Sequence, residues 1–158
     1  MIEIWTDGAC ANNGKNKGIG GWGAVLCFKE HRKEIYGTEI NATNNEVELL
    51  AVIRAIEAVK TKQYPITIYS DSAYIVDCVN HGWYCKWINN DWKTSEGEPV
   101  KNKLIWKRLL YLRTQFDIKF VLVKGHSGIE LNERADELAV MAKKSAPGYI
   151  DKVTKCGK

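Results

Sequence analysis

Apolar and polar side chains alternate along the first part of the chain, which is the pattern of half-buried β-strands. The alternation predicts strands over Ile2–Thr6, Gly21–Phe28 and Lys33–Ile40, the last two joined by a charged turn. Cys10–Gly21 is rich in Gly, Asn and Lys and is predicted to be an exposed loop. Three strands in quick succession with short turns indicate an antiparallel meander.

The period of the pattern changes after this meander. Thr43-Asn44-Asn45-Glu46 has the form of a helix capping box, and it predicts a helix over Val47–Val59. Strands and helices then alternate, which requires parallel pairing with helices packed on the sheet. The expected elements are a strand at Pro65–Ser70, helices at Ser72–Val79 and Lys101–Thr114, a strand at Ile118–Val123 and a helix at Glu133–Lys144.

These elements predict one α/β domain over residues 1–144, followed by a flexible tail over residues 145–158. Its sheet is expected to be mixed and five-stranded, with three antiparallel strands, then parallel strands, and helices on both faces.

Composition narrows the possible environments. With 158 residues, 45% hydrophobic and 27% charged, the chain fits a single ordinary globular domain. No apolar run approaches the ~18 residues of a membrane span, and the polar start lacks the basic head of a signal peptide. The five scattered cysteines show no zinc spacing and indicate free thiols. We therefore expect a cytoplasmic monomer, and the net charge of +4 mildly favours a polyanionic partner.

Glu48 occupies the apolar face of its predicted helix. It lies about 180° around the helix from Glu57, which shares a polar stripe with Arg54 and Lys60. An ionised carboxylate among apolar side chains costs several kcal/mol unless a positive group meets it. A wet glutamate near the start of the helix, stabilised by the helix dipole, is the alternative interpretation.

Three aspartates can join Glu48. Asp7 follows the first strand and Asp71 the fourth, so parallel pairing of these strands would bring both carboxylates to the sheet edge where such folds bind ligands. Asp136 lies at the border of the apolar stripe of the last helix. Four converging carboxylates repel unless hard cations neutralise them, which indicates Mg²⁺ or Mn²⁺. Two such ions about 4 Å apart suit phosphodiester hydrolysis. Each aspartate taken alone is more often a cap or a solvated charge.

At these residues the chain resembles type 1 ribonuclease H of the bacterial, stand-alone kind. The resemblance covers about residues 1–143, in family order and spacing. It is carried by Thr6-Asp7-Gly8-Ala9-Cys10, Thr43-Asn44-Asn45-Glu46-Val47-Glu48-Leu49, Tyr69-Ser70-Asp71-Ser72, Lys124-Gly125-His126-Ser127-Gly128 and Asn132-Glu133-Arg134-Ala135-Asp136-Glu137-Leu138-Ala139.

The resemblance implies an endonuclease that cuts the RNA strand of an RNA/DNA hybrid with two metal ions, leaving 3′-hydroxyl and 5′-phosphate ends. It implies that Asp7 bridges both ions, that Glu48 holds the ion nearer the leaving group, and that Asp136 holds the ion that activates water. Asp71 is the fourth metal ligand by the same resemblance. His126 is then expected on a mobile loop, where it assists proton transfer or product release.

The resemblance also implies substrate-binding residues. Cys10, Asn44 and Asn45 match positions that contact the 2′-hydroxyl, which a hybrid displays in its wide minor groove. Thr43 and Asn102 match a pocket for a DNA phosphate. Residues 81–103, here named the handle, match a basic protrusion of bacterial members. Trp83 and Lys86 are its expected contacts, whereas Trp87 is expected to pack the handle's own core.

The sequence departs from the family pattern at several substrate positions. Ala73 stands where relatives often have a substrate-contacting glutamine, and Asn41 and Glu46 stand where some have arginines. The handle has four lysines against Asp91, Glu96 and Glu98, a net charge of +1.

Three alternatives stay open at this point. The chain could be a non-catalytic hybrid-binding domain, although clustered carboxylates would not help a protein that only binds. It could be the ribonuclease H module of a reverse transcriptase, against which the start at Met1 and the intact handle weigh. A resolvase-like nuclease acting on DNA is disfavoured by Asn44 and Asn45.

We predict from the weakly basic handle that hybrid binding has a shallow salt dependence, because affinity falls with salt in proportion to the phosphates neutralised. Equilibrium binding of a labelled hybrid across a series of NaCl concentrations measures the slope. A slope that corresponds to several released counterions would contradict the prediction, because it would mean that many phosphates are neutralised.

Overall fold

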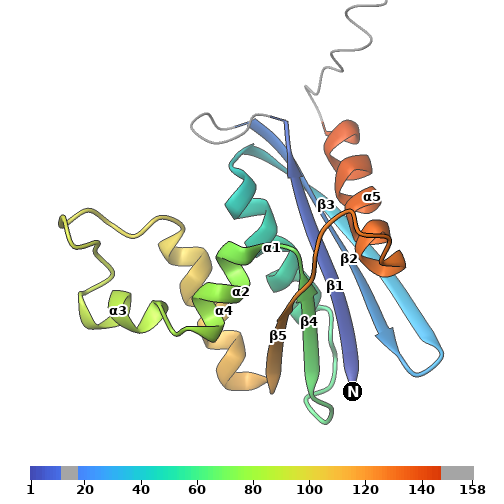
Figure 1. Cartoon of the computed structure of the whole chain (residues 1–158), viewed down its shortest axis with the longest axis horizontal. Helices are drawn as coiled ribbons and strands as arrows, with labels where there is room; N and C mark the ends of the chain where they lie inside the picture. Colours follow the sequence, from blue (N-terminus) through green and yellow to red (C-terminus); the bar gives the residue numbers. More distant parts are fainter. Residues whose placement is uncertain (12–17, 147–158) are drawn as a thin grey trace, which may run out of the picture.

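The computed structural model describes residues 1–11 and 18–146. Five strands form one sheet in the order β3-β2-β1-β4-β5 (Figure 1). The strands are β1 (Ile2–Cys10), β2 (Gly18–Phe28), β3 (His31–Ala42), β4 (Ile66–Ser70) and β5 (Ile118–Leu122). β1, β2 and β3 pair antiparallel, and β4 and β5 add parallel to β1. The predicted mixed sheet is confirmed.

Helices cover both faces of the sheet, as predicted. The helices are α1 (Asn44–Glu57), α2 (Ala73–Asn80), α3 (Tyr84–Asn89), α4 (Lys103–Gln115) and α5 (Glu130–Ser145). α1, α2 and α4 lie on one side, α5 lies on the other, and α3 projects beyond the sheet edge (Figure 1). The main apolar core lies between the sheet and α1, α2 and α4, where Ile4, Ile68 and Trp106 are fully buried.

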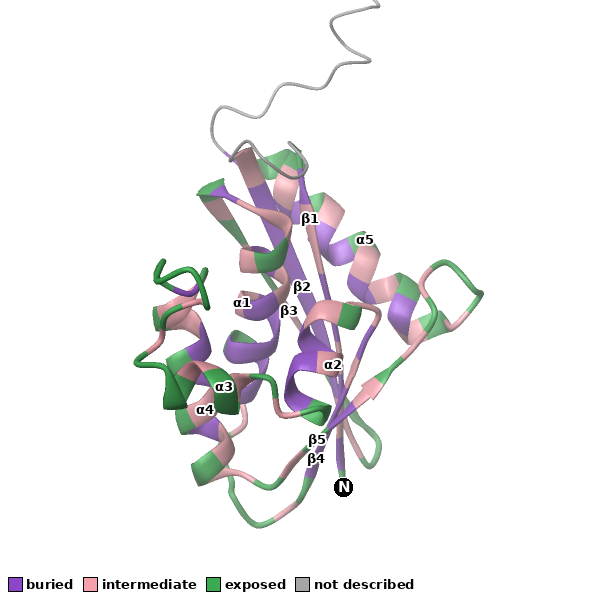
Figure 2. Cartoon of the chain, turned by 60° about the vertical axis from the view of Figure 1, so that its left-hand side comes forward, coloured by how far each residue is buried: buried purple, intermediate pink, exposed green. Residues whose placement is uncertain are grey.

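The capping box positions α1. The Thr43 side chain accepts a hydrogen bond from the Glu46 main-chain N–H at 3.3 Å, which satisfies one of the free donors at the helix start. The helix therefore begins at Asn44, three residues before the predicted start at Val47. Its buried side chains pack in the core, and the buried residues of α1 are purple in Figure 2.

Glycines let α5 approach the opposite face of the sheet closely. A Cβ atom at Gly21 would meet the main chain of Ala139 and Lys143, and one at Gly23 would meet Leu138 and the main chain of Ala135. Both glycines belong to β2, so the helix rests on a strip of sheet without side chains. Glycine is required at these positions for space, because any side chain would push the helix outward.

Two antiparallel strands are longer than the alternation predicts. β1 continues to Cys10 and β2 begins at Gly18, inside the range predicted as loop. Cys10 pairs with Gly20 across the ladder. Ladder hydrogen bonds belong to the main chain, so glycines can extend a strand that their side-chain pattern does not reveal.

The handle contains a helix that the sequence pattern did not predict. α3 has six residues, none of them buried, and its N-cap Trp83 makes no side-chain cap hydrogen bond. Tyr84, Trp87 and Ile88 recur at helical spacing, but the element is only six residues long and has no capping residue, so its sequence signal is weak. At the other end of the chain, α5 begins at Glu130 rather than Glu133, and Ala146 is buried after it.

The remainder of the predicted tail, residues 147–158, lies outside the described residues, as does the centre of the predicted loop, residues 12–17. In the part of the chain that the structure describes, no helix combines the length and apolar character needed to cross a bilayer.

We predict that Gly21→Ala destabilises the fold more than Gly20→Ala does. The new Cβ at position 21 would press on main-chain atoms of α5, which move only with the helix, whereas at position 20 its one tight contact would be with a side-chain methyl group of Val47. Overpacking of this kind costs about 1–3 kcal/mol of unfolding free energy. Urea unfolding of both variants measures the difference, and equal stabilities would contradict it.

Candidate active site at the carboxyl ends of the parallel strands

Asp7 and Asp71 meet where the parallel pairing of β1 and β4 ends. Thr6 pairs with Ser70, and each aspartate is the next residue along its strand direction. β1 continues beyond this point on β2, whereas β4 stops at Ser70. The two chains thus separate and leave both carboxylates at the sheet edge.

Glu48 reaches the same place from α1. One carboxylate oxygen each of Asp7, Glu48 and Asp71 lies within 4.8 Å of the others. Glu48 Oε2 is buried and has no hydrogen-bond partner among the described residues. A buried oxygen without a donor, facing two further carboxylates, suits a hard divalent cation and no neutral partner. The residues therefore fit a metal ion.

The electrostatics of this cluster are those of crowded like charges. Burial, the charge of Asp71 and the nearby Asp136 raise the pKa of Asp7 to about 8, from an ordinary 3.8. Burial and the charges of Asp7 and Asp71 raise the pKa of Glu48 well above its usual range. The pKa of Asp71 is also raised, by burial and by Asp136. Bound cations would reverse these shifts, because they favour the ionised form.

Two glycines that the sequence argument did not single out hold the cluster together. The Gly8 main-chain N–H donates to Asp7 Oδ1 at 2.9 Å, and a Cβ at Gly8 would meet the main chain of Val47 and Glu48. A Cβ at Gly125 would lie 2.7 Å from Asp71 Oδ2. The sequence signal for both was their place beside candidate residues, Gly8 after Asp7 and Gly125 before His126.

Asp136 and His126 complete the predicted set. Asp136, on α5, is half-buried and acts electrostatically on Asp7 and Asp71, but it is outside the group of three that shares one 4.8 Å cluster. His126 is exposed on the loop between β5 and α5, with a φ of 55°. It lies close enough to Asp71 to lower the pKa of that carboxyl.

Comparison with known proteins identifies the family. Residues 1–144 match the family model described as RNase H. The chain belongs to the ribonuclease H family.

Sequence relatives and solved structures match nearly all of this chain. Ribonuclease H of Syntrophomonas wolfei is 48% identical over 144 residues, which are 91% of this chain and 97% of that protein. LC9-RNase H1, a type 1 RNase H with the type 2 active-site motif, is 28% identical with a TM-score of 0.79, covering 90% of this chain and 71% of its own. LC11-RNase H1, solved in complex with an RNA/DNA hybrid, shares the fold at 24% identity and a TM-score of 0.67, covering 91% and 97%.

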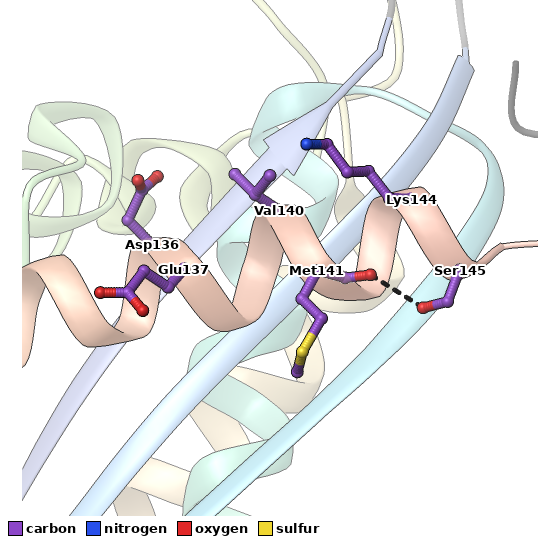
Figure 3. A pocket seen from close by; sticks show the side chains of 6 residues that line it. All are labelled: Asp136, Glu137, Val140, Met141, Lys144 and Ser145. Atoms are coloured by element: carbon purple, nitrogen blue, oxygen red, sulfur yellow. Dashed lines mark hydrogen bonds between the residues drawn. The ribbon is translucent and has the colours of Figure 1, made fainter. Parts of the chain in front are cut away.

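A shallow hollow of about 530 Å³ borders Asp136 along α5 of this ribonuclease H (Figure 3). Its other lining residues are Glu137, Val140, Met141, Lys144 and Ser145. Figure 3 shows the Asp136 and Glu137 side chains leaving the helix in different directions. The Asp136 carboxylate is thus accessible from the surface, whereas Asp7 is buried.

The other predicted binding residues surround the start of α1 and the handle. Thr43, Asn44 and Asn45 form the N-cap and the start of the first turn of α1, and they precede Glu48 by three to five residues. Cys10 is buried, and its thiol donates to the Ala42 carbonyl at 3.1 Å.

Handle residues divide between surface and core. Trp83 is exposed and stacks on His81, with ring centroids 5.8 Å apart. Lys86 is exposed and lines a hollow with Lys93. Trp87 lies against Trp92 of the handle and packs edge-on against the buried Trp106 of α4 at 5.4 Å, so it joins the handle to the main core.

Asn102 immediately precedes α4 with a φ of 62°, a left-handed conformation that asparagine tolerates better than most residues. It makes no side-chain cap hydrogen bond to that helix.

We predict that the metal-free protein loses stability as pH rises. The folded-state pKa of Asp7 is raised, so the folded protein keeps a proton that the unfolded chain releases. This contribution is complete below about pH 4 and is lost as pH rises towards 8. Thermal melting in EDTA should show the Tm falling across this window, and MgCl₂ should raise the Tm more at pH 8 than at pH 5.

Asp7→Asn removes one carboxylate and should flatten both dependences. If the Tm of the wild-type protein depends on neither pH nor MgCl₂, the three carboxylates do not form a metal-binding cluster in which like charges repel.

Proposed function

We propose that this member of the ribonuclease H family hydrolyses the RNA strand of RNA/DNA hybrids in a metal-dependent reaction, leaving 3′-hydroxyl and 5′-phosphate ends. The observation that carries the proposal is the cluster of Asp7, Glu48 and Asp71, whose oxygens lie within 4.8 Å of one another beside the first turn of α1. The family membership supplies the reaction type, and the solved hybrid complex of LC11-RNase H1 supports the substrate class.

Asp7, Glu48 and Asp71 would hold divalent ions, with Asp136 completing the ligand set from α5. Bound divalent ions supply charge neutralisation at the scissile phosphate and a water of lowered pKa. The four carboxylates orient that phosphate by setting where positive charge can reside. The burial of Asp7 and Glu48 strengthens their attraction to a bound cation, because the charges are less screened than in bulk water.

His126 is suited to move a proton at the edge of the site. His126 is exposed on a loop that also contains Gly125 and Gly128, and its own backbone is in the left-handed conformation. A histidine can give or take a proton near neutral pH. We assign it the transfer of a proton to the leaving 3′-oxygen, or assistance to product release, rather than metal binding.

Substrate recognition is proposed for residues at the N-terminal end of α1. Asn44 and Asn45 would read the 2′-hydroxyl of the RNA strand, and Thr43 and Asn102 would grip a phosphate of the DNA strand, because a helix N-terminus attracts anions. The thiol of Cys10 is committed to Ala42, so its contribution would come from its main chain. Trp83 and Lys86 are exposed, as handle contacts require.

Mg²⁺ is the proposed physiological ion, with Mn²⁺ as a substitute, because all the candidate ligands are carboxylate oxygens. A monomeric state is proposed alongside this function, and the cytoplasm is proposed from the state of the cysteines. Cys10, Cys27, Cys78 and Cys85 are free thiols, a state that a reducing compartment maintains.

Incubation of the protein with an end-labelled RNA/DNA hybrid, single-stranded RNA, duplex RNA and duplex DNA tests the proposal. We expect cleavage of the RNA in the hybrid alone, in the presence of Mg²⁺ and not of EDTA. Tight hybrid binding without cleavage would instead support a non-catalytic binding domain, and cleavage of duplex DNA would support a resolvase-like nuclease.

Asp71→Asn should reduce cleavage by at least about 10²-fold while hybrid binding survives, because the shape is kept and a ligand charge is lost. His126→Ala should reduce turnover far less than Asp7→Asn. Asp117→Asn is the matched control, since Asp117 is exposed just before β5. Full activity of Asp71→Asn would mean that Asp71 is not a ligand.

A further inference from the structure

Among the four candidate carboxylates, Asp136 alone comes from a helix on the opposite face of the sheet from α1. Asp7 and Asp71 come from paired strands, and Glu48 comes from a helix whose backbone contacts Gly8. Asp136 instead comes from α5, across the sheet from α1 (Figure 1). The orientation of α5 therefore decides whether Asp136 can act with the other three.

The face of α5 that packs on the sheet is made mostly of small side chains. Its buried residues are Asn132, Ala135, Leu138, Ala139 and Ala142, and the helix lies against Gly21 and Gly23, which have no side chains. Small side chains on glycine interlock less than large ones, so polar contacts at the edge of this interface add to the control of the helix rotation. At the start of the helix the N-cap Ile129 makes no side-chain cap hydrogen bond, and the Glu133 carboxylate accepts one from the Gly128 main-chain N–H at 3.2 Å. The loop before it includes Gly128 with a φ of 84°.

An ion pair between α5 and β3 adds a directional constraint on the rotation of the helix. Arg134 of α5 binds Glu34 of β3 in a bidentate manner, with Nε 2.8 Å from Oε2 and the second guanidinium nitrogen 3.0 Å from Oε1. Arg32 approaches the same Glu34 carboxylate at 2.9 Å, and Arg134 also binds Glu137 at 3.1 Å. The two arginines lower the pKa of Glu34 to about 2, so the pair stays charged at any working pH.

Arg134 and Asp136 lie on different sides of α5. Two residues correspond to about 200° around a helix, so fixing Arg134 towards β3 directs Asp136 away from that edge. A carboxylate about 6 Å from the helix axis would move about 1 Å if the helix rolled by about 10°. Displacements of this size at a catalytic group can cost about 10²-fold in rate.

We propose that Glu34 and Arg134 are positioning residues, which set the rotation of α5 and thereby hold the Asp136 carboxylate in the active site. The planar, bidentate geometry carries the argument, because two parallel hydrogen bonds fix orientation whereas a single point charge does not. The inference rests on the proposed function, since it gives Asp136 its catalytic role.

Glu34→Gln and Arg134→Lys test the proposal in the full-length protein. Each keeps the approximate size of the side chain and removes the bidentate pair; Arg134→Lys also keeps the charge. We expect kcat for the hybrid to fall about 10-fold and the Mg²⁺ concentration for half-maximal activity to rise several-fold. The KM for the hybrid should stay within about twofold, because the substrate contacts are elsewhere.

Glu57→Gln is the matched control. Glu57 of α1 binds Arg108 of α4 through two guanidinium nitrogens, at 3.2 and 2.9 Å. The side chains of Glu57 and Glu34 are equally exposed, each at 28%. Both losses should lower the Tm by a similar few degrees, about 2–4 °C, as for other surface pairs. Only Glu34→Gln should change kcat and the Mg²⁺ requirement.

A readout without activity accompanies the kinetics. In metal-free protein, Glu34→Gln should shift amide resonances along residues 133–139 in ¹H–¹⁵N spectra, and Glu57→Gln should leave them unchanged. Wild-type kcat and Mg²⁺ dependence in both Glu34→Gln and Arg134→Lys would overturn the inference, as would an equal effect of Glu57→Gln. Failure of the wild-type protein to cleave the hybrid would instead overturn the proposed function.

Discussion

Repulsion between carboxylates is the constraint on which the arrangement of this protein depends. Asp7, Glu48 and Asp71 are held within one small cluster, although burial and mutual charge raise the pKa of each. Such a cluster forms only where packing elsewhere outweighs its cost. The sheet supplies that packing with fully buried residues such as Ile4 and Ile68 directly below the site. The stored repulsion is what makes a cation a favourable partner.

Close contacts between helix and strand backbones allow carboxylates from the sheet, from α1 and from α5 to approach one another. Gly8 lets α1 approach β1 on one face, and Gly21 and Gly23 let α5 approach β2 on the other. A side chain at any of these positions would separate a helix from the sheet and withdraw its carboxylate. The same economy of space explains Gly125, which allows the histidine-bearing loop to pass against Asp71. Small residues thus control the chemistry without contributing a functional group.

The handle is held in place by aromatic packing rather than by close contacts at glycines. It is attached to the core through aromatic contacts, with Trp87 packed between Trp92 and the buried Trp106. A cation from α4 adds to this attachment, since Lys107 lies over the Trp92 ring at 5.4 Å. The attachment is aromatic, whereas the outer surface of the handle combines the exposed Trp83 and Ile88 with the exposed Lys86.

The sequence alone determined the mixed sheet, the helices on both faces and the identity of the candidate carboxylates, because periodicity and the placement of Asp7 and Asp71 after strands are local signals. It did not reveal α3, which is only six residues long and has no side-chain cap. Nor could it show how near the carboxylates come to one another, or that Glu34 meets Arg134 a hundred positions later in the chain. Only the tertiary structure decides these, because such contacts depend on the packing of whole elements rather than on the residues next to them in sequence.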